Sequence, residues 1–176
     1  MIINPHDTKR CICGSRGCFG ACVYESRLIE EAMAARTEYP DSRIFKENSA
    51  DGITAETIFE SAGKGDPLAR ICLDTMINWF AIAFSNLIVV NDPEIIVIQG
   101  IYAKAGDYFI DSLTQRVNRL VLSKIKKDVV IRYSEIGPEI GALGASLFVI
   151  SEYFKQEVLP SLGNERKNGK ISKGRT

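Results

Sequence analysis

The stretch that decides the fold is Cys11–Cys18, which reads Cys-Ile-Cys-Gly-Ser-Arg-Gly-Cys. It places three thiols within eight residues and includes two glycines, Gly14 and Gly17, which allow the backbone to bend tightly. Structural zinc ions bind about four sulfur or nitrogen ligands in a tetrahedron. A catalytic zinc needs an open position and a pocket with a general base, and nothing in the sequence points to one. The spacing therefore predicts a structural zinc site with Cys11, Cys13 and Cys18 as ligands.

Three cysteines leave one position of the zinc tetrahedron to be filled. His6 is the single histidine of the chain and precedes Cys11 by a few residues. Cys22 lies one helical turn beyond Cys18, so in a helix its thiol faces the same side. A residue upstream of Met1 is the third possibility. The sequence leaves these three alternatives open.

Composition and cysteine usage limit the class of protein. The chain has 22 basic and 22 acidic residues, so it has no overall charge with which to hold nucleic acid or an anionic membrane surface. Clustering of the cysteines near the N-terminus argues against a disulfide framework spread along the chain. No basic stretch followed by an apolar run marks a secretory leader, and the longest apolar run, 79–90, is too short to span a bilayer. We therefore expect a cytoplasmic protein with no membrane partner.

The remaining sequence alternates helical and strand patterns. Apolar residues at helical or strand spacing predict five helices and two strands, in the order helix 19–36, helix 54–63, helix 67–90, strand 94–98, helix 105–122, strand 128–133 and helix 138–154. The polar stretch 37–52 is predicted to be a surface loop. Strand 94–98 reads Glu-Ile-Ile-Val-Ile without alternation, which is typical of a strand covered on both faces. This order predicts the α/β fold class.

The cysteine pattern Cys-x-Cys-Gly-x-x-Gly-Cys, followed directly by a helix, resembles the zinc signature of the ROK family of sugar kinases and sugar-responsive repressors. Residues 91–100 resemble the strand and glycine turn of the family, and residues 136–145 resemble its C-terminal glycine-rich helix start. The resemblance implies the C-terminal lobe of a two-lobed, actin-like ATPase (ribonuclease-H-like) fold. We therefore expect a zinc-binding loop at 1–18, the α/β lobe at 19–155 and a disordered polar and basic tail at 156–176.

For function, the resemblance implies two classes. The first is the effector-sensing and oligomerisation lobe of a sugar-responsive transcriptional regulator similar to xylose repressors. The alternative is a fragment of an ATP-dependent sugar kinase of the hexokinase or glucokinase type. The family's general-base aspartate belongs to the first lobe and has no counterpart here, so no catalytic residue is expected. Its zinc-binding histidine precedes the position of Met1, and His6 does not align with it.

Two departures from the family pattern favour the regulator. The family usually has a glutamate two residues after the last signature cysteine, where it accepts hydrogen bonds from sugar hydroxyls, and this chain has Gly20. Kinase members tend to have consecutive glycines after the strand, where the backbone approaches the nucleotide, and here Gln99 replaces the first of them. Gly100 and Gly141 remain as candidate turns of the nucleotide- or phosphate-binding type.

The resemblance also implies the partners. We expect a homodimer, because ROK proteins commonly pair through their C-terminal lobes. A sugar effector is expected in the full-length protein, and DNA contact is expected through a helix-turn-helix segment outside this chain.

Overall fold

The computed structural model describes residues 1–48, 52–121, 129–137 and 139–163. The chain divides into two units, Met1–Ser134 and Glu135–Thr176. The elements of the first unit are α1 (Phe19–Cys22), α2 (Glu25–Ala34), α3 (Arg43–Lys46), α4 (Ala55–Gly63), α5 (Pro67–Asn91), β1 (Ile95–Ile98), the 3₁₀ helix η2 (Ile101–Lys104), α6 (Gly106–Leu120) and β2 (Val130–Tyr133). The second unit contains α7 (Ile140–Gly163). The α/β class is confirmed.

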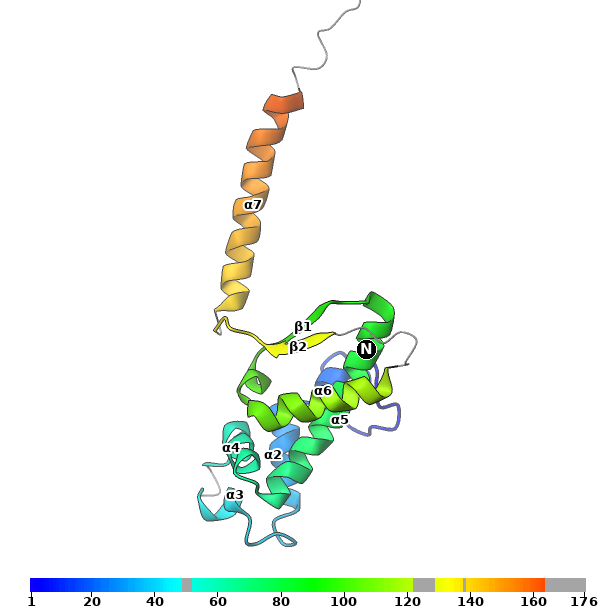
Figure 1. Ribbon diagram of the computed structural model, residues 1–176, viewed down its shortest axis with the longest axis vertical. Helices are drawn as coiled ribbons and strands as arrows, with labels where there is room; N and C mark the ends of the chain where they lie inside the picture. Colours follow the sequence, from blue (N-terminus) through cyan, green and yellow to red (C-terminus); the bar gives the residue numbers. More distant parts are fainter. Residues whose placement is uncertain (49–51, 122–128, 138, 164–176) are drawn as a thin grey trace, which may run out of the picture. The chain divides into compact units, whose positions relative to one another are not determined.

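Helix α5 forms the centre of the first unit. It begins at Pro67, whose missing N–H has no helical partner at that position, and the Asp66 carboxylate caps it by accepting a hydrogen bond from the Ala69 amide. It ends where Asp92 adopts a left-handed conformation. By length and composition α5 is able to cross a membrane, but it contributes buried apolar residues to the core and contacts α2, α4 and α6, which lie around it in Figure 1. It is therefore the core helix of this unit.

An aromatic cluster joins α5 to its neighbours. Phe80 lies at its centre, with ring centroids 5.0 Å from Phe19, 5.7 Å from Phe84, 4.8 Å from Tyr102 and 5.3 Å from Phe109. All four of these ring pairs meet edge to face, which is a favourable arrangement for aromatic side chains. The cluster connects α1, α5, η2 and α6, so the helix that follows the cysteine loop rests on the main core.

The sheet consists of two parallel strands in the described residues, with Ile95 of β1 opposite Val130 of β2. Ile98 and Ile131 face inward and join the core. The other face carries Ile95, Val97 and Val130, which are 47%, 51% and 51% exposed. Within the first unit the neighbouring helices cover one face of the pair, so this unit by itself does not supply the cover on both faces that was predicted for strand 94–98.

Two further predictions need correction. The helix predicted at 19–36 is two helices, because Tyr24 adopts an extended conformation and caps α2. This break lets Phe19 reach the aromatic cluster while Leu28 packs into the core from α2. The stretch 37–52, predicted to be a polar surface loop, contains α3, capped by Ser42 and anchored by the fully buried Ile44.

The second unit is described by itself. Helix α7 begins two residues later than predicted and extends to Gly163, so the expected domain boundary at 155/156 falls inside this helix. Residues 164–176 of the predicted tail lie outside the described residues. The domain assignment 1–18, 19–155 and 156–176 stays a prediction.

Candidate metal centre

Backbone hydrogen bonds fold the cysteine loop into a tight turn. The Cys11 amide donates to the Ser15 carbonyl at 2.8 Å, and the Gly14 amide donates to the Cys11 carbonyl at 2.9 Å. Gly14 sits at the bend with a positive φ of 85°, a conformation that glycine adopts without strain. These two local hydrogen bonds therefore bend the part of the loop that carries Cys11 and Cys13.

Gly17 fixes the loop against the N-terminal segment. Its carbonyl accepts hydrogen bonds from the amides of Ile3 and Asn4, and its φ is 67°. A Cβ added at Gly17 would lie 1.8 Å from the Asn4 carbonyl oxygen, far inside van der Waals contact. Only glycine fits this position without displacing the backbone.

The three sulfurs predicted to bind zinc are close together. The Sγ atoms of Cys11, Cys13 and Cys18 all lie within 4.8 Å of one another, and those of Cys13 and Cys18 are 3.4 Å apart. Thiolates around zinc at about 2.3 Å in a tetrahedron are separated by roughly 3.8 Å. The donor set and its spacing therefore fit zinc with small side-chain adjustments, and thiolates are ligands that this ion prefers.

The two internal candidates for a fourth ligand do not join this cluster. Cys22 is buried and its thiol donates to the Asp7 carboxylate at 3.6 Å. His6 is exposed, and its backbone amide donates to the Asn4 side chain. In the described part of the chain the metal-type cluster consists of Cys11, Cys13 and Cys18. Of the three alternatives for the fourth ligand, His6 and Cys22 therefore lie outside the cluster, and a residue upstream of Met1 stays a prediction.

The electrostatics of the cluster favour a thiolate at Cys13. A backbone hydrogen bond from Ser15, followed by hydrogen bonds with Cys18 and Cys11, lowers the pKa of Cys13 to about 7. The same interaction with Cys13 acts in the opposite direction on Cys18 and, together with partial desolvation, raises its pKa to about 11. One thiol of the pair is thus prepared to lose its proton near neutral pH, as a metal ligand must.

A buried ion pair that the sequence did not predict, between Asp7 and Arg27, connects the loop to helix α2. Asp7 is almost fully buried, and Arg27 of α2 donates to its carboxylate at 2.6 Å. Burial opposes ionisation of Asp7, but hydrogen bonds from the Lys9 amide and the Arg27 guanidinium outweigh it and lower the pKa of Asp7. Asp7 and Arg27 are 20 residues apart in the sequence. No spacing rule connects two such positions in a loop and a helix, so the sequence carried no signal for the pair.

The glycines proposed as nucleotide-type turns lie in different units. Gly100 follows β1 with a φ of 78°, and a Cβ added there would meet nothing within 4 Å. Gly141 lies in the first turn of α7. Gln99 and Gly20, the two departures from the family pattern, are both exposed. The roles of Gly100 and Gly141 in binding a nucleotide or phosphate therefore stay predictions.

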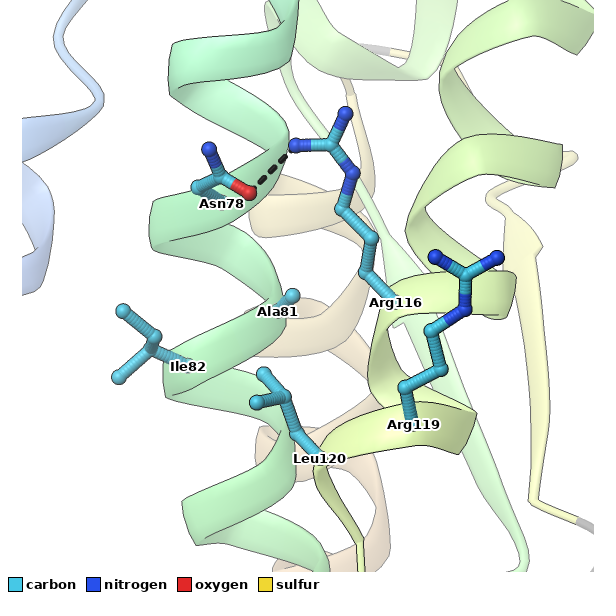
Figure 2. Close-up of a pocket in the computed structure, with 6 residues that line it drawn as sticks. All are labelled: Asn78, Ala81, Ile82, Arg116, Arg119 and Leu120. Atoms are coloured by element: carbon cyan, nitrogen blue, oxygen red, sulfur yellow. Dashed lines mark hydrogen bonds between the residues drawn. The ribbon is translucent and has the colours of Figure 1, made fainter.

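A second feature that the sequence did not reveal is a cavity of about 260 Å³ between α5 and α6. Figure 2 shows Ala81, Ile82 and Leu120 on its apolar side and Arg116 reaching across to Asn78. Arg116 also forms an ion pair with Asp74 at 2.7 Å, so its charge is already balanced. The cavity is smaller than typical ligand sites of about 300–1,000 Å³. It does not carry a functional assignment.

Comparison with known proteins finds similarity to one family and to both sugar kinases and repressors. A family model described as the ROK family matches residues 1–152. A glucokinase from Halalkalibacterium halodurans is 26% identical over 166 residues, which are 94% of this chain and 49% of that protein. A xylose repressor from Caldicellulosiruptor bescii is 22% identical over 142 residues, 81% of this chain and 36% of the repressor.

Solved structures agree on the fold. The structure of a ROK family glucokinase from Streptomyces griseus, in complex with glucose and AMPPNP, matches with a TM-score of 0.72 at 23% identity. The match covers 82% of this chain and 48% of that chain. The chain spans about half the length of the glucokinases it matches and about a third of the repressor. Its relatives include both enzymes and repressors.

Proposed function

The chain belongs to the ROK family, and we propose that it is the zinc-containing C-terminal lobe of a sugar-responsive transcriptional regulator of that family. In such a protein a sugar effector shifts an equilibrium between a state that binds its operator and a state that does not. The lobe contributes to effector sensing and to assembly. Contact with DNA belongs to polypeptide outside these 176 residues.

The observation that carries this proposal is Gln99. It stands exposed at the end of β1, directly before Gly100. The kinase members that this chain resembles tend to have a glycine at this position, where the backbone approaches the nucleotide. A Gln side chain adds bulk where those kinases have only backbone, which favours a lobe that no longer uses ATP.

Zinc has a structural role in this proposal. Cys11, Cys13 and Cys18 would hold it, with a fourth ligand from outside the cluster. A bound structural zinc supplies folding free energy to a segment that has little apolar core of its own. The prediction is about one zinc per chain in protein purified without chelator. Elemental analysis that finds no zinc, with the thiols of Cys11, Cys13 and Cys18 freely titratable, would contradict this part of the proposal.

The effector site requires a sugar-binding side chain that Gly20 cannot supply. A Cβ added at Gly20 would meet nothing within 4 Å, so the fold tolerates a larger residue there. Gly20→Glu is therefore expected to leave the unfolding free energy within about 0.5 kcal/mol of the parent. If the first lobe is supplied, this variant should bind sugar more tightly than the parent does.

A homodimer in the cytoplasm completes the proposal. The uncovered face of β1 and β2, with Val89 and Val90 exposed at the end of α5, gives the first unit an apolar surface suited to association. Light scattering over a dilution series is the test. A dimer mass that resists moderate salt is expected, and a monomer mass at tens of micromolar, about the concentration at which a specific interface saturates, would contradict it.

The second candidate function is that of a sugar kinase fragment. It is favoured by the similarity to glucokinases, which extends over more of this chain than the similarity to the xylose repressor does. Such a chain would supply the nucleotide side of a phosphoryl-transfer site, in which positioning provides most of the catalysis.

Nucleotide binding by the purified chain separates the two candidates. A regulator lobe is expected to show no saturable binding of AMPPNP by calorimetry up to millimolar concentration, and Gln99→Gly is expected to gain binding. Gln99→Ala, which retains a Cβ, is the matched control and should gain less. Saturable binding by the parent chain, unchanged in Gln99→Gly, would favour the kinase.

A further inference from the structure

Two thiols of the metal cluster lie closer together than a shared ion requires. The Sγ atoms of Cys13 and Cys18 are 3.4 Å apart, whereas Cys11 is placed only within 4.8 Å of the others. A disulfide needs a separation of about 2.05 Å. The sulfurs of Cys13 and Cys18 therefore need to approach by only about 1.4 Å to reach bonding distance.

The loop is built so that Cys13 is able to make this movement. Cys13 is exposed and precedes Gly14, around which an added Cβ would meet nothing within 4 Å. Cys18, in contrast, is held at the start of α1 directly after Gly17, which is packed against Asn4. Cys13 is thus the partner with open space around it, and Cys18 is the partner next to an anchored backbone.

We propose that Cys13 and Cys18 form a reversible disulfide under oxidation by a hydroperoxide, and that this reaction releases the metal and makes the loop a redox switch. The metal-release half of the proposal rests on the zinc site proposed above, and the disulfide half does not.

The chemistry balances with one equivalent of oxidant. A thiolate of the pair attacks the O–O bond of the hydroperoxide, becomes a sulfenic acid and releases an alcohol, or water when the oxidant is hydrogen peroxide. The sulfur of the second cysteine then attacks the sulfenic sulfur, forms the S–S bond and releases water. The two cysteines lose two electrons and two protons in total, and the peroxide is reduced.

Metal release follows from ligand loss. A disulfide sulfur is no longer a thiolate, and the thiolate is the form that binds zinc. Oxidation of Cys13 and Cys18 therefore leaves Cys11 as the only thiolate of the cluster, too few ligands for a tetrahedral site. Reduction regenerates both ligands and permits zinc to bind again.

The other two cysteines serve as internal references. Cys72 is in the core, and burial, together with Glu31 and Asp66, raises its pKa to about 11. Cys22 is fully buried against Asp7. Both should remain reduced under conditions that oxidise the exposed pair.

Peptide mapping of the full chain tests the disulfide directly, first in metal-free protein treated with stoichiometric hydrogen peroxide. Trypsin cleaves after Arg10, Arg16 and Arg27, so a Cys13–Cys18 disulfide joins peptide 11–16 to peptide 17–27. A disulfide between Cys11 and Cys13 stays inside peptide 11–16. The expected result is the joined pair, a loss of two of the five titratable thiols, and full reversal by dithiothreitol.

Three variants sharpen the assignment. The joined peptides should persist in Cys22→Ala, which excludes Cys22 as the partner in peptide 17–27, and in Cys11→Ser. They should disappear in Cys13→Ser. A disulfide confined to peptide 11–16, or overoxidation to sulfinic acid without any joined pair, would overturn the proposal.

A second arm uses zinc-loaded chain and a chromophoric zinc chelator. One equivalent of zinc should appear on oxidation, in step with the joined peptides, and Cys72→Ser should behave like the parent. Disulfide formation with zinc retained would overturn the switch. Absence of zinc before oxidation would count against the zinc site while the metal-free arm still decides the disulfide.

Discussion

The cysteine loop and the helical core of the same unit are stabilised in different ways. The core around α5 buries large apolar side chains such as Leu73, Met76 and Phe109 completely. The loop at residues 1–18 is held by backbone hydrogen bonds, a buried ion pair and a thiol cluster. The stability of the core depends on how much apolar side-chain volume and area is buried. The stability of the loop depends on the positions of a few polar atoms. Substitutions in the two regions should therefore lower stability through different kinds of interaction.

The largest expected effect comes from the core. Phe109→Ala removes a fully buried ring that contacts Phe80 and Tyr102, and should lower the unfolding free energy by about 4 kcal/mol. Urea denaturation followed by far-UV circular dichroism measures this. Ile71→Ala on the exposed side of α5 is the control and should cost less than about 1 kcal/mol. Equal losses in the two variants would mean that the packing described for α5 and α6 is wrong.

Breaking the ion pair beneath the loop should have the next largest effect. Arg27→Ala leaves the buried Asp7 carboxylate without its cation, which typically costs about 3 kcal/mol or more. Arg43→Ala breaks an exposed pair with Glu47 and should cost less than about 1 kcal/mol. Thermal unfolding of both variants provides the comparison. Similar melting temperatures for the two would show that Asp7 is hydrated.

A third substitution separates loop geometry from core stability. Gly17→Ala adds a Cβ that clashes with Asn4 and imposes a left-handed conformation on alanine, which alone costs roughly 1–2 kcal/mol. Zinc affinity should fall by well over tenfold, since 1.4 kcal/mol corresponds to a factor of ten. Gly14 also has a positive φ, but a Cβ added there meets no neighbouring atom. The zinc affinity of Gly14→Ala should therefore fall less than that of Gly17→Ala. Competition with a chromophoric chelator measures both, and equal affinities would contradict the contact with Asn4.

The smallest expected effect is the pH dependence of the loop. Because the pKa of Asp7 is lower in the folded chain than its usual value of 3.8, its ionised form stabilises the fold. That stabilisation is complete above the unfolded pKa and is lost as pH falls through the lower folded pKa. The difference in unfolding free energy between the parent and Asp7→Asn should be constant above about pH 5 and shrink below about pH 4. A constant difference down to pH 2 would contradict the assignment.

The same contrast between loop and core explains what the sequence made predictable. The helices predicted at 54–63 and 67–90 follow from local spacing, and both are observed, as α4 and α5. The cluster of three thiols was also predictable, because all three cysteines lie within the eight residues 11–18. Asp7 and Arg27 meet only because α2 packs beside the loop, which is tertiary information. The break at Tyr24 and the burial of Ile44 depend in the same way on contacts made elsewhere in the chain.

The face of β1 and β2 that the helices of the first unit leave uncovered should govern how fast the strands exchange their amide hydrogens. The ladder contains four residue pairs, and opening it exposes few apolar contacts that were not already in water. Amides of the strands should therefore exchange with deuterium by local opening, long before those of α5, whose exchange requires unfolding of the core. A partner that covers the face of Ile95, Val97 and Val130 would slow the exchange of the strands toward that of the helix. Deuterium uptake of this short segment is thus a sensitive reporter of whether the lobe is free or assembled.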